Sequence, residues 1–302
     1  MTQILGVVRE GKLIPEEMWK KFMQSIENPF DSLETNRERA KRTLASKIIE
    51  AVKKRASGKF GISFSGGVDS ALIAFIAKKL NCDFTCYTVG LANSEDIIWA
   101  QRIAKEYNFR HVSRILSLQE FESVIKNAAK LLNEPDVTKV SVGAVLYAAG
   151  KLALNDNIRS LLGGLGSEEI FAGYQRHSEA LQQNNYEALH KECWNGLKNM
   201  WQRDLVRDFT IARNLGLELR TPFLDKEVIQ YAMSIHPMYK IDRNDKKLIL
   251  RDAAEFIGLK KEFAWRKKKA AQYGSDFIDG LDKLAAKAHF SYKRDYLGSL
   301  LK

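Results

Sequence analysis

A six-residue stretch between two apolar runs restricts the fold of this chain more than any other feature of the sequence. Residues 60–64 have the length and the aromatic and β-branched content of a buried strand. Residues 71–80 carry apolar side chains at helical spacing. The stretch between them reads SGGVDS. These six residues therefore connect a strand directly to a helix.

The side chains of this loop point to an anion site. Gly66 and Gly67 permit positive φ and a close approach of the backbone to a ligand. The following helix directs unpaired N–H groups and the positive end of its dipole at the loop, while Ser65 and Ser70 add hydroxyl donors. Asp69 would repel a bare phosphate, which predicts a Mg²⁺ ion between its carboxylate and the phosphates. The alternative is a Ser/Gly turn that merely caps a helix, with Asp69 placed in the first turn by the dipole.

Strand and helix patterns alternate through the first half of the chain. Strands are predicted at residues 60–64, 83–90, 110–116 and 158–164, and helices at 36–56, 71–80, 94–108, 118–132 and 141–154. This alternation predicts an α/β fold with a doubly wound parallel sheet, whose ligand lies beyond the carboxyl ends of the strands. From about residue 178 onward the pattern is mostly helical.

A second glycine-rich turn follows the last predicted strand. The stretch LLGGLGSEEIFAGYQRH, residues 161–177, again reads as a strand, a turn and a helix start. Two such turns at strand ends can face one nucleotide, and Glu168 or Glu169 can complete a Mg²⁺ shell that Asp69 begins. Both acids are also favoured at any helix N-terminus, so that simpler interpretation stays open.

A run of cations lies later in the chain, in the stretch WRKKKAAQYGS at residues 265–275. Such a cluster can reach phosphates on which negative charge builds in a transition state. The alternative is a solvated surface.

The loop at residues 65–70 lacks the lysine of the kinase and GTPase phosphate loop. It resembles instead the pyrophosphate loop of the ATP pyrophosphatase superfamily, whose members cleave ATP between the α and β phosphates. Five stretches stand in one order: SFSGGVDS, YTVGL, GGLGSEEIFAGY, LELRTPFLD and WRKKKAAQYG. That series resembles the synthetase domain of glutamine-dependent asparagine synthetases over about residues 36–276.

The resemblance implies a role for each motif. The SGGxDS loop would hold pyrophosphate, the Val-Gly pair after the second strand would meet adenine, and the second glycine-rich loop would line the acyl-adenylate pocket. A late lysine would stabilise the charge that develops at the phosphates. If the match to the family motif is shifted by one residue, this role belongs to Lys267 or Lys269. The implied site residues are Ser65, Gly66, Gly67, Asp69, Ser70, Val89, Gly90, Gly164, Gly166, Glu168 and Lys268.

The sequence differs from this family at residues that the resemblance would place near the acceptor, the substrate that is adenylated. Leu165 replaces a glutamate of the second loop, and Ser141 lies in a region where the family carries an arginine and a Ser-Thr-Pro run. We therefore expect an acceptor other than plain aspartate. The residues of these stretches are more similar to those of the divergent asparagine synthetase domain-containing proteins, in which an apolar residue also replaces the loop glutamate. The chain starts Met1-Thr2 without the family's nucleophilic cysteine, so we expect ammonia that is free or supplied by a separate subunit, or a different nucleophile.

The resemblance divides the chain into an N-terminal extension (1–35), an ATP pyrophosphatase domain (36–276) and a helical tail (277–302). Within the domain, the sheet core is expected at about 58–177 and a helical part at about 178–276. No apolar run reaches transmembrane length and no leader is recognisable, which predicts a cytoplasmic protein without a membrane partner. The three cysteines and five histidines show no metal-ligand spacing.

We predict an ATP-dependent carbon–nitrogen ligase that forms AMP and PPi, with ATP and Mg²⁺ at the site and ammonia as the nucleophile. The net charge of +11 suits a polyanion, either ATP or RNA. It keeps a tRNA base-modifying ATP pyrophosphatase as an alternative. A nucleotide-binding regulatory protein without turnover is a further alternative, because Leu165 has no acid–base chemistry.

Overall fold

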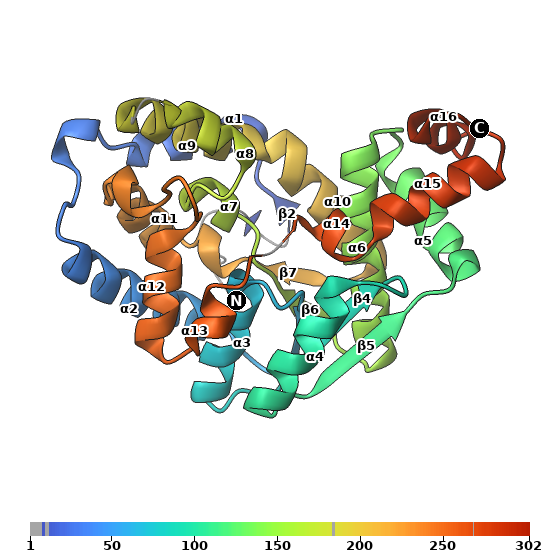
Figure 1. The fold of residues 1–302 in the computed structure, drawn as a ribbon, viewed down its shortest axis with the longest axis horizontal. Helices are drawn as coiled ribbons and strands as arrows, with labels where there is room; N and C mark the ends of the chain where they lie inside the picture. Colours follow the sequence, from blue (N-terminus) through green and yellow to red (C-terminus); the bar gives the residue numbers. More distant parts are fainter. Residues whose placement is uncertain (1–7, 10–11, 183–184, 268) are drawn as a thin grey trace. The chain divides into compact units, whose positions relative to one another are not determined.

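The computed structural model describes residues 8–9, 12–182, 185–267 and 269–302 (Figure 1). The chain divides into two compact units, which we call the sheet unit (residues 58–163, 206–220 and 266–302) and the helical unit (residues 1–57, 164–205 and 221–265).

The sheet unit contains a five-stranded parallel sheet with the strand order β5-β4-β3-β6-β7. Its strands are β3 (Phe60–Ser63), β4 (Phe84–Gly90), β5 (His111–Ile115), β6 (Ser160–Leu162) and β7 (Glu218–Arg220). Its helices are α3 (Val68–Lys79), α4 (Glu95–Tyr107), α5 (Leu118–Leu132), α6 (Val137–Asn155), α10 (Val206–Leu215), α14 (Ala271–Gly274), α15 (Phe277–Lys287) and α16 (Lys293–Ser299). The order of the strands reverses at β3, which confirms the predicted doubly wound α/β fold.

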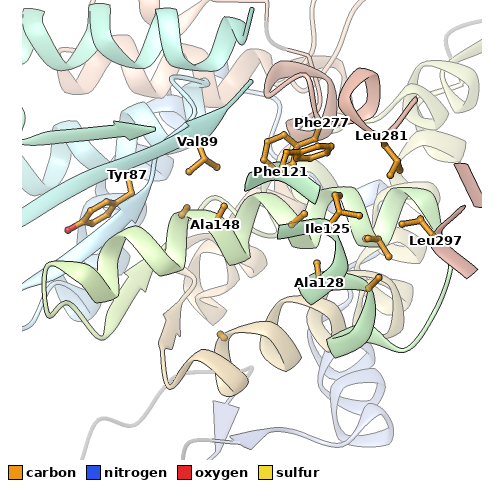
Figure 2. Packing of buried hydrophobic residues seen from close by; sticks show 14 of the residues in the cluster. Tyr87, Val89, Phe121, Ile125, Ala128, Ala148, Phe277, Leu281 and Leu297 are labelled. Atoms are coloured by element: carbon orange, nitrogen blue, oxygen red, sulfur yellow. The ribbon is translucent and has the colours of Figure 1, made fainter. Parts of the chain in front are cut away.

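Both faces of this sheet are covered, and β4 is buried along its whole length. On one face, Phe60 stacks on Phe84, and Phe84 packs edge-on against Phe109 at the end of α4. On the other face, Tyr87 and Val89 join an apolar core with residues of α5, α6, α15 and α16 (Figure 2). Alternate side chains of one strand therefore enter two cores, as a doubly wound sheet requires.

The predicted elements of this unit are present with small shifts in their ends. Ser94 caps α4 by accepting from the Ile97 N–H, as its position in the sequence predicts. The helix predicted at 141–154 begins four residues earlier than expected, because Asp136 accepts from the Lys139 N–H at 2.7 Å and caps α6 at Val137. α6 has the length and apolar content to span a membrane, contrary to the expectation from the sequence, but Val140, Ala144 and Ala148 bury its inner face in the core.

The helical unit is built largely of helices. Its elements are β1 (Val8–Arg9), β2 (Lys12–Leu13), α1 (Glu16–Ile26), η1 (Phe30–Ser32), α2 (Arg37–Arg55), α7 (Ser167–Ile170), α8 (Gln175–Ala180), α9 (Tyr186–Met200), η3 (Trp201–Leu205), η4 (Pro222–Leu224), α11 (Lys226–Ser234), η5 (Pro237–Tyr239), α12 (Leu248–Ile257) and α13 (Lys261–Ala264). β1 and β2 form a short antiparallel pair. Trp19 of α1 is fully buried and donates to the Leu197 carbonyl of α9 at 2.8 Å, which joins segments far apart in the sequence.

Candidate nucleotide-binding site

The SGGVDS loop joins the carboxyl end of β3 to the first turn of α3, as predicted. Gly66 adopts a positive φ of +67°, and a Cβ at this position would lie 3.0 Å from the Ala100 backbone nitrogen. Only glycine therefore fits here without strain. Gly67 differs from the expectation: its φ is −74° and it is the N-cap residue of α3, a conformation open to any residue.

The two serine hydroxyls shape the loop. Ser65 Oγ lies 3.4 Å from Ser70 Oγ, and Ser70 Oγ donates to the Gly67 carbonyl at 3.3 Å. Ser70 is buried, whereas Ser65 is half-buried. The hydroxyls thus close the turn around the two glycines and keep the N-terminal N–H groups of α3 in one region.

Asp69 lies in the first turn of α3 and is half-buried. Among the residues that the structure describes, no three His, Cys, Asp or Glu side chains converge on a metal site. Mg²⁺ does not require such a cluster, because it is commonly held by one or two carboxylates together with substrate phosphates. The position of Asp69 beside a glycine-rich anion loop fits that mode of binding.

Arg266 contacts the SGGVDS loop, although the sequence motifs did not single it out. Its Nη1 donates to the Ser65 carbonyl at 2.7 Å, and its Nη2 lies 3.0 Å from Asp96 Oδ1. Both side chains are buried. In the sequence, Arg266 is a single arginine that precedes three lysines, and the neighbouring residues do not distinguish it from a cation at the surface.

The predicted late lysine, Lys268, lies outside the described residues. Its neighbour Lys267 is exposed, and Lys269 pairs with Glu95 in the first turn of α4 at 2.7 Å. Farther along, Ser94 Oγ donates to the Gly274 carbonyl at 2.9 Å. The described residues Arg266, Lys269 and Gly274 thus contact the start of α4, within the unit that carries the SGGVDS loop.

The predicted adenine residues, Val89 and Gly90, end β4. The Val89 side chain is buried in the same apolar core as Phe121 (Figure 2), so only its main chain is available to a ligand. A Cβ at Gly90 would lie 2.3 Å from Ser94 Oγ. Glycine is therefore needed at position 90 because the N-cap residue of α4 lies close to the backbone there.

The second glycine-rich loop belongs to the helical unit from Gly164 onward. Gly166 has a φ of +94° and precedes α7, and a Cβ there would lie 2.3 Å from Leu224 Cδ2. Glu168, the predicted second metal ligand, accepts from Lys247 Nζ at 2.6 Å. Lys247 is buried and was not singled out from the sequence, because it is distant in the chain and its partner is set by folding.

Glu169 has a different environment from its neighbour. It is almost fully buried and accepts from Arg203 of η3, which also contacts Asp204 at 2.7 Å. Burial and the adjacent Asp204 charge raise the pKa of Glu169 above its usual range. Glu169 therefore belongs to an internal ion network, and Glu168 is the more exposed acid of the pair.

The SGGVDS loop and the GGLGSEE loop lie in different units, so their meeting at one nucleotide stays a prediction. The assignment of the individual residues to ATP, pyrophosphate and metal also stays a prediction.

Comparison with known proteins identifies relatives along most of the chain. The family model for asparagine synthase matches residues 43–188 and 180–295. A putative glutamine-hydrolysing asparagine synthetase of Methanocaldococcus jannaschii is 37% identical over 86% of this chain and 54% of its own length. A probable asparagine synthetase of Acanthamoeba polyphaga mimivirus is 33% identical over 86% of this chain and 48% of its own length.

Among solved structures, NMN synthetase from Francisella tularensis aligns over 89% of this chain and 97% of its own, with a TM-score of 0.40 and 12% identity. The chain spans about half the length of the curated relatives that it matches. The family model covers far more than half of the chain, and its span includes both glycine-rich loops and the segment that follows Trp265. The chain therefore belongs to the asparagine synthase family.

Proposed function

We propose that the protein is an ATP-dependent carbon–nitrogen ligase that adenylates a carboxyl or carbonyl oxygen and then forms an amide with ammonia. The observation that carries the proposal is the SGGVDS loop, with positive φ at Gly66, at the junction of β3 and the N-terminus of α3. A loop of this geometry is suited to polyphosphate. Family membership supports the ligase chemistry.

The reaction would proceed in two steps. An acceptor carboxylate oxygen attacks the α-phosphorus of ATP, and the α–β bond breaks so that PPi leaves with the bonding electron pair. Ammonia then attacks the carbonyl carbon of the acyl-adenylate, loses a proton, and AMP leaves. The sum is ATP, a carboxylate and ammonia converted to an amide, AMP and PPi.

The chain's own groups would bind and orient the phosphates. Backbone N–H groups of the loop and of α3 face the anion, and the Ser65 and Ser70 hydroxyls hold the loop closed. We propose Asp69 as a Mg²⁺ ligand; the second carboxylate predicted from the sequence, Glu168, belongs to the helical unit. When bound, Mg²⁺ would neutralise phosphate charge. Lys268 is proposed, from the sequence resemblance, to stabilise the charge that grows on the leaving pyrophosphate.

The acceptor is proposed to differ from free aspartate. Leu165 stands where the family carries a glutamate, and a leucine can neither deprotonate an amine nor bind a cationic group. Ser141, at the expected arginine position, is buried in α6 and donates its hydroxyl to the Val137 carbonyl of its own helix at 2.5 Å. It therefore offers no charge for a substrate carboxylate.

An isotope experiment tests the proposal. The protein is incubated with MgATP, ammonium and a panel of ¹⁸O-carboxylates, and AMP is analysed by mass spectrometry. The expected result is AMP that carries one ¹⁸O atom from an accepted carboxylate, with little product from aspartate. A strong signal with aspartate would restore plain asparagine synthesis. Unlabelled ADP, or no nucleotide cleavage with any acceptor, would contradict the ligase.

A second candidate is activation of a carbonyl in tRNA, which the net charge of +11 favours. It predicts AMP release that depends on RNA, and RNA affinity that falls steeply with salt. AMP release that is independent of RNA would exclude this candidate, while nucleotide binding without cleavage under all conditions would point to a regulatory protein.

A further inference from the structure

Arg266 makes two contacts that a solvated cation would not make. Its guanidinium is buried, and it joins the main chain of the SGGVDS loop to the first turn of α4. The partners are the Ser65 carbonyl at 2.7 Å and the Asp96 carboxylate at 3.0 Å. The same guanidinium lies 5.2 Å from the centre of the Trp99 ring. Three groups from two segments therefore hold one side chain.

The contact with Ser65 has a geometric consequence for the loop. In a trans peptide the C=O and the following N–H point in opposite directions. Because Arg266 holds the Ser65 carbonyl, the Gly66 N–H points away from the guanidinium. A Cβ at Gly66 would lie 3.1 Å from Arg266 Nη1, so the glycine also permits this close approach.

The contact with Asp96 fixes the guanidinium itself. Asp96 is buried, and a Cβ on Gly274 would lie 2.6 Å from its carboxylate, so the acid is enclosed on that side. A guanidinium presents donors in a rigid planar fork and satisfies two acceptors at once, whereas a lysine ammonium acts as a single compact charge. The pair of contacts therefore requires arginine.

We propose that Arg266 is a positioning residue for the phosphate loop: it turns the Ser65 carbonyl away from the ligand and presents the Gly66 N–H to it. The inference rests on the proposed nucleotide site but assigns a role to a residue outside the SGGVDS loop. Arg266 does not itself contact phosphate in this role. Its effect is confined to the phosphate end of the ligand.

The variant Arg266→Lys keeps a positive charge opposite Asp96 and loses the second contact. We expect its MgATP affinity to fall about tenfold or more, since a hydrogen bond that involves a charged group typically changes affinity by at least that factor. Adenosine affinity should stay unchanged. Arg102→Lys is the matched control, because Arg102 lies 5.0 Å from the same Trp99 ring and is exposed. Calorimetry with MgATP and with adenosine measures both affinities.

A second pair of variants removes the buried Asp96 charge first, so that the loss of the Arg266 guanidinium leaves no unpaired carboxylate. Asp96→Asn retains the contact between Arg266 and Ser65, whereas Asp96→Asn with Arg266→Met has neither buried charge and no donor to Ser65. We expect the double variant to bind MgATP about tenfold more weakly than Asp96→Asn, with equal adenosine affinity. A purely structural role would lower both affinities together.

The outcomes separate the two proposals. A wild-type protein that binds no MgATP overturns the proposed function. The positioning role of Arg266 is wrong if the wild type binds MgATP and Arg266→Lys binds it with equal affinity. It is also wrong if the double variant and Asp96→Asn bind MgATP with equal affinity. Equal losses for MgATP and adenosine would also overturn it.

Discussion

Lys247 Nζ lies 2.6 Å from Glu168 Oε1 and 3.1 Å from Ser167 Oγ, so a buried ammonium holds the more exposed acid of the GGLGSEE loop. Gly173 makes this arrangement possible, because a Cβ on Gly173 would lie 1.6 Å from Glu168 Oε2. The orientation of the Glu168 carboxylate thus depends on its contact with Lys247 and on the space that Gly173, which has no side chain, leaves for it.

The variant Gly173→Ala should displace this carboxylate from Lys247. We expect it to lower the free energy of unfolding by about 1–3 kcal/mol, because the buried Lys247 ammonium loses this carboxylate partner. Urea denaturation measures the loss. Gly163→Ala is the matched control, since a Cβ there would meet nothing within 4 Å. Equal stability of the two variants would show that Glu168 moves aside without cost.

Asp69→Asn should weaken MgATP binding several-fold or more, because the amide has no charge for the metal while the helix N-terminus is preserved. Binding measured in EDTA should change far less. Asp83→Asn is a suitable control, since Asp83 is exposed just before β4, at the amino end of the sheet. Identical MgATP affinities for the wild type and Asp69→Asn would disprove the metal role.

Lys268→Ala should lower single-turnover AMP formation roughly a hundredfold, as the loss of one transition-state donor does at comparable sites. ATP affinity should change little, because charge on the bridging oxygen grows only as the α–β bond breaks. Lys267→Ala and Lys269→Ala serve as neighbours for comparison. If all three variants form AMP at the wild-type rate, none of these lysines stabilises the transition state. If only Lys267→Ala or only Lys269→Ala is slower, that lysine has the role proposed for Lys268.

Lys240 is fully buried, and its ammonium donates to Met233 Sδ at 3.3 Å. Burial lowers the pKa of Lys240 to about 8, from a usual value of 10.5. Between these values the unfolded chain binds the proton more tightly, so stability should rise with pH from about 8 to 10.5.

Lys240→Met should flatten this rise and increase stability at pH 7 by on the order of 1–3 kcal/mol, because it removes a buried charge. Thermal unfolding across the pH range provides the measurement. Lys53→Met, at a side chain that is 63% exposed, should leave both quantities unchanged. An unaltered pH slope in Lys240→Met would assign the rise to another group.

Local chemistry along the chain was enough to predict much of the fold. The strand and helix that flank residues 65–70 were predicted correctly, as was the cap at Ser94, because periodicity and capping act over a few neighbouring residues. The start of α6 was misplaced, because the cap at Asp136 stands before the strong apolar pattern begins. The alternation of strand and helix predicted a parallel, doubly wound sheet. It predicted neither the order of the strands nor β7, which lies in the part of the chain that was expected to be mostly helical.

The sequence by itself determined that a glycine-rich turn would stand between β3 and α3, since Gly66 and the residues around it carry that information locally. Only the tertiary structure decided that Arg266 reaches Ser65 across 201 residues of chain, that Lys247 binds Glu168, and that the Val89 side chain enters the core. It also separated the adjacent acids, because burial rather than residue type raises the pKa of Glu169. Contacts between distant segments and the loss of water around a charge arise only when the chain is packed, so no local pattern records them.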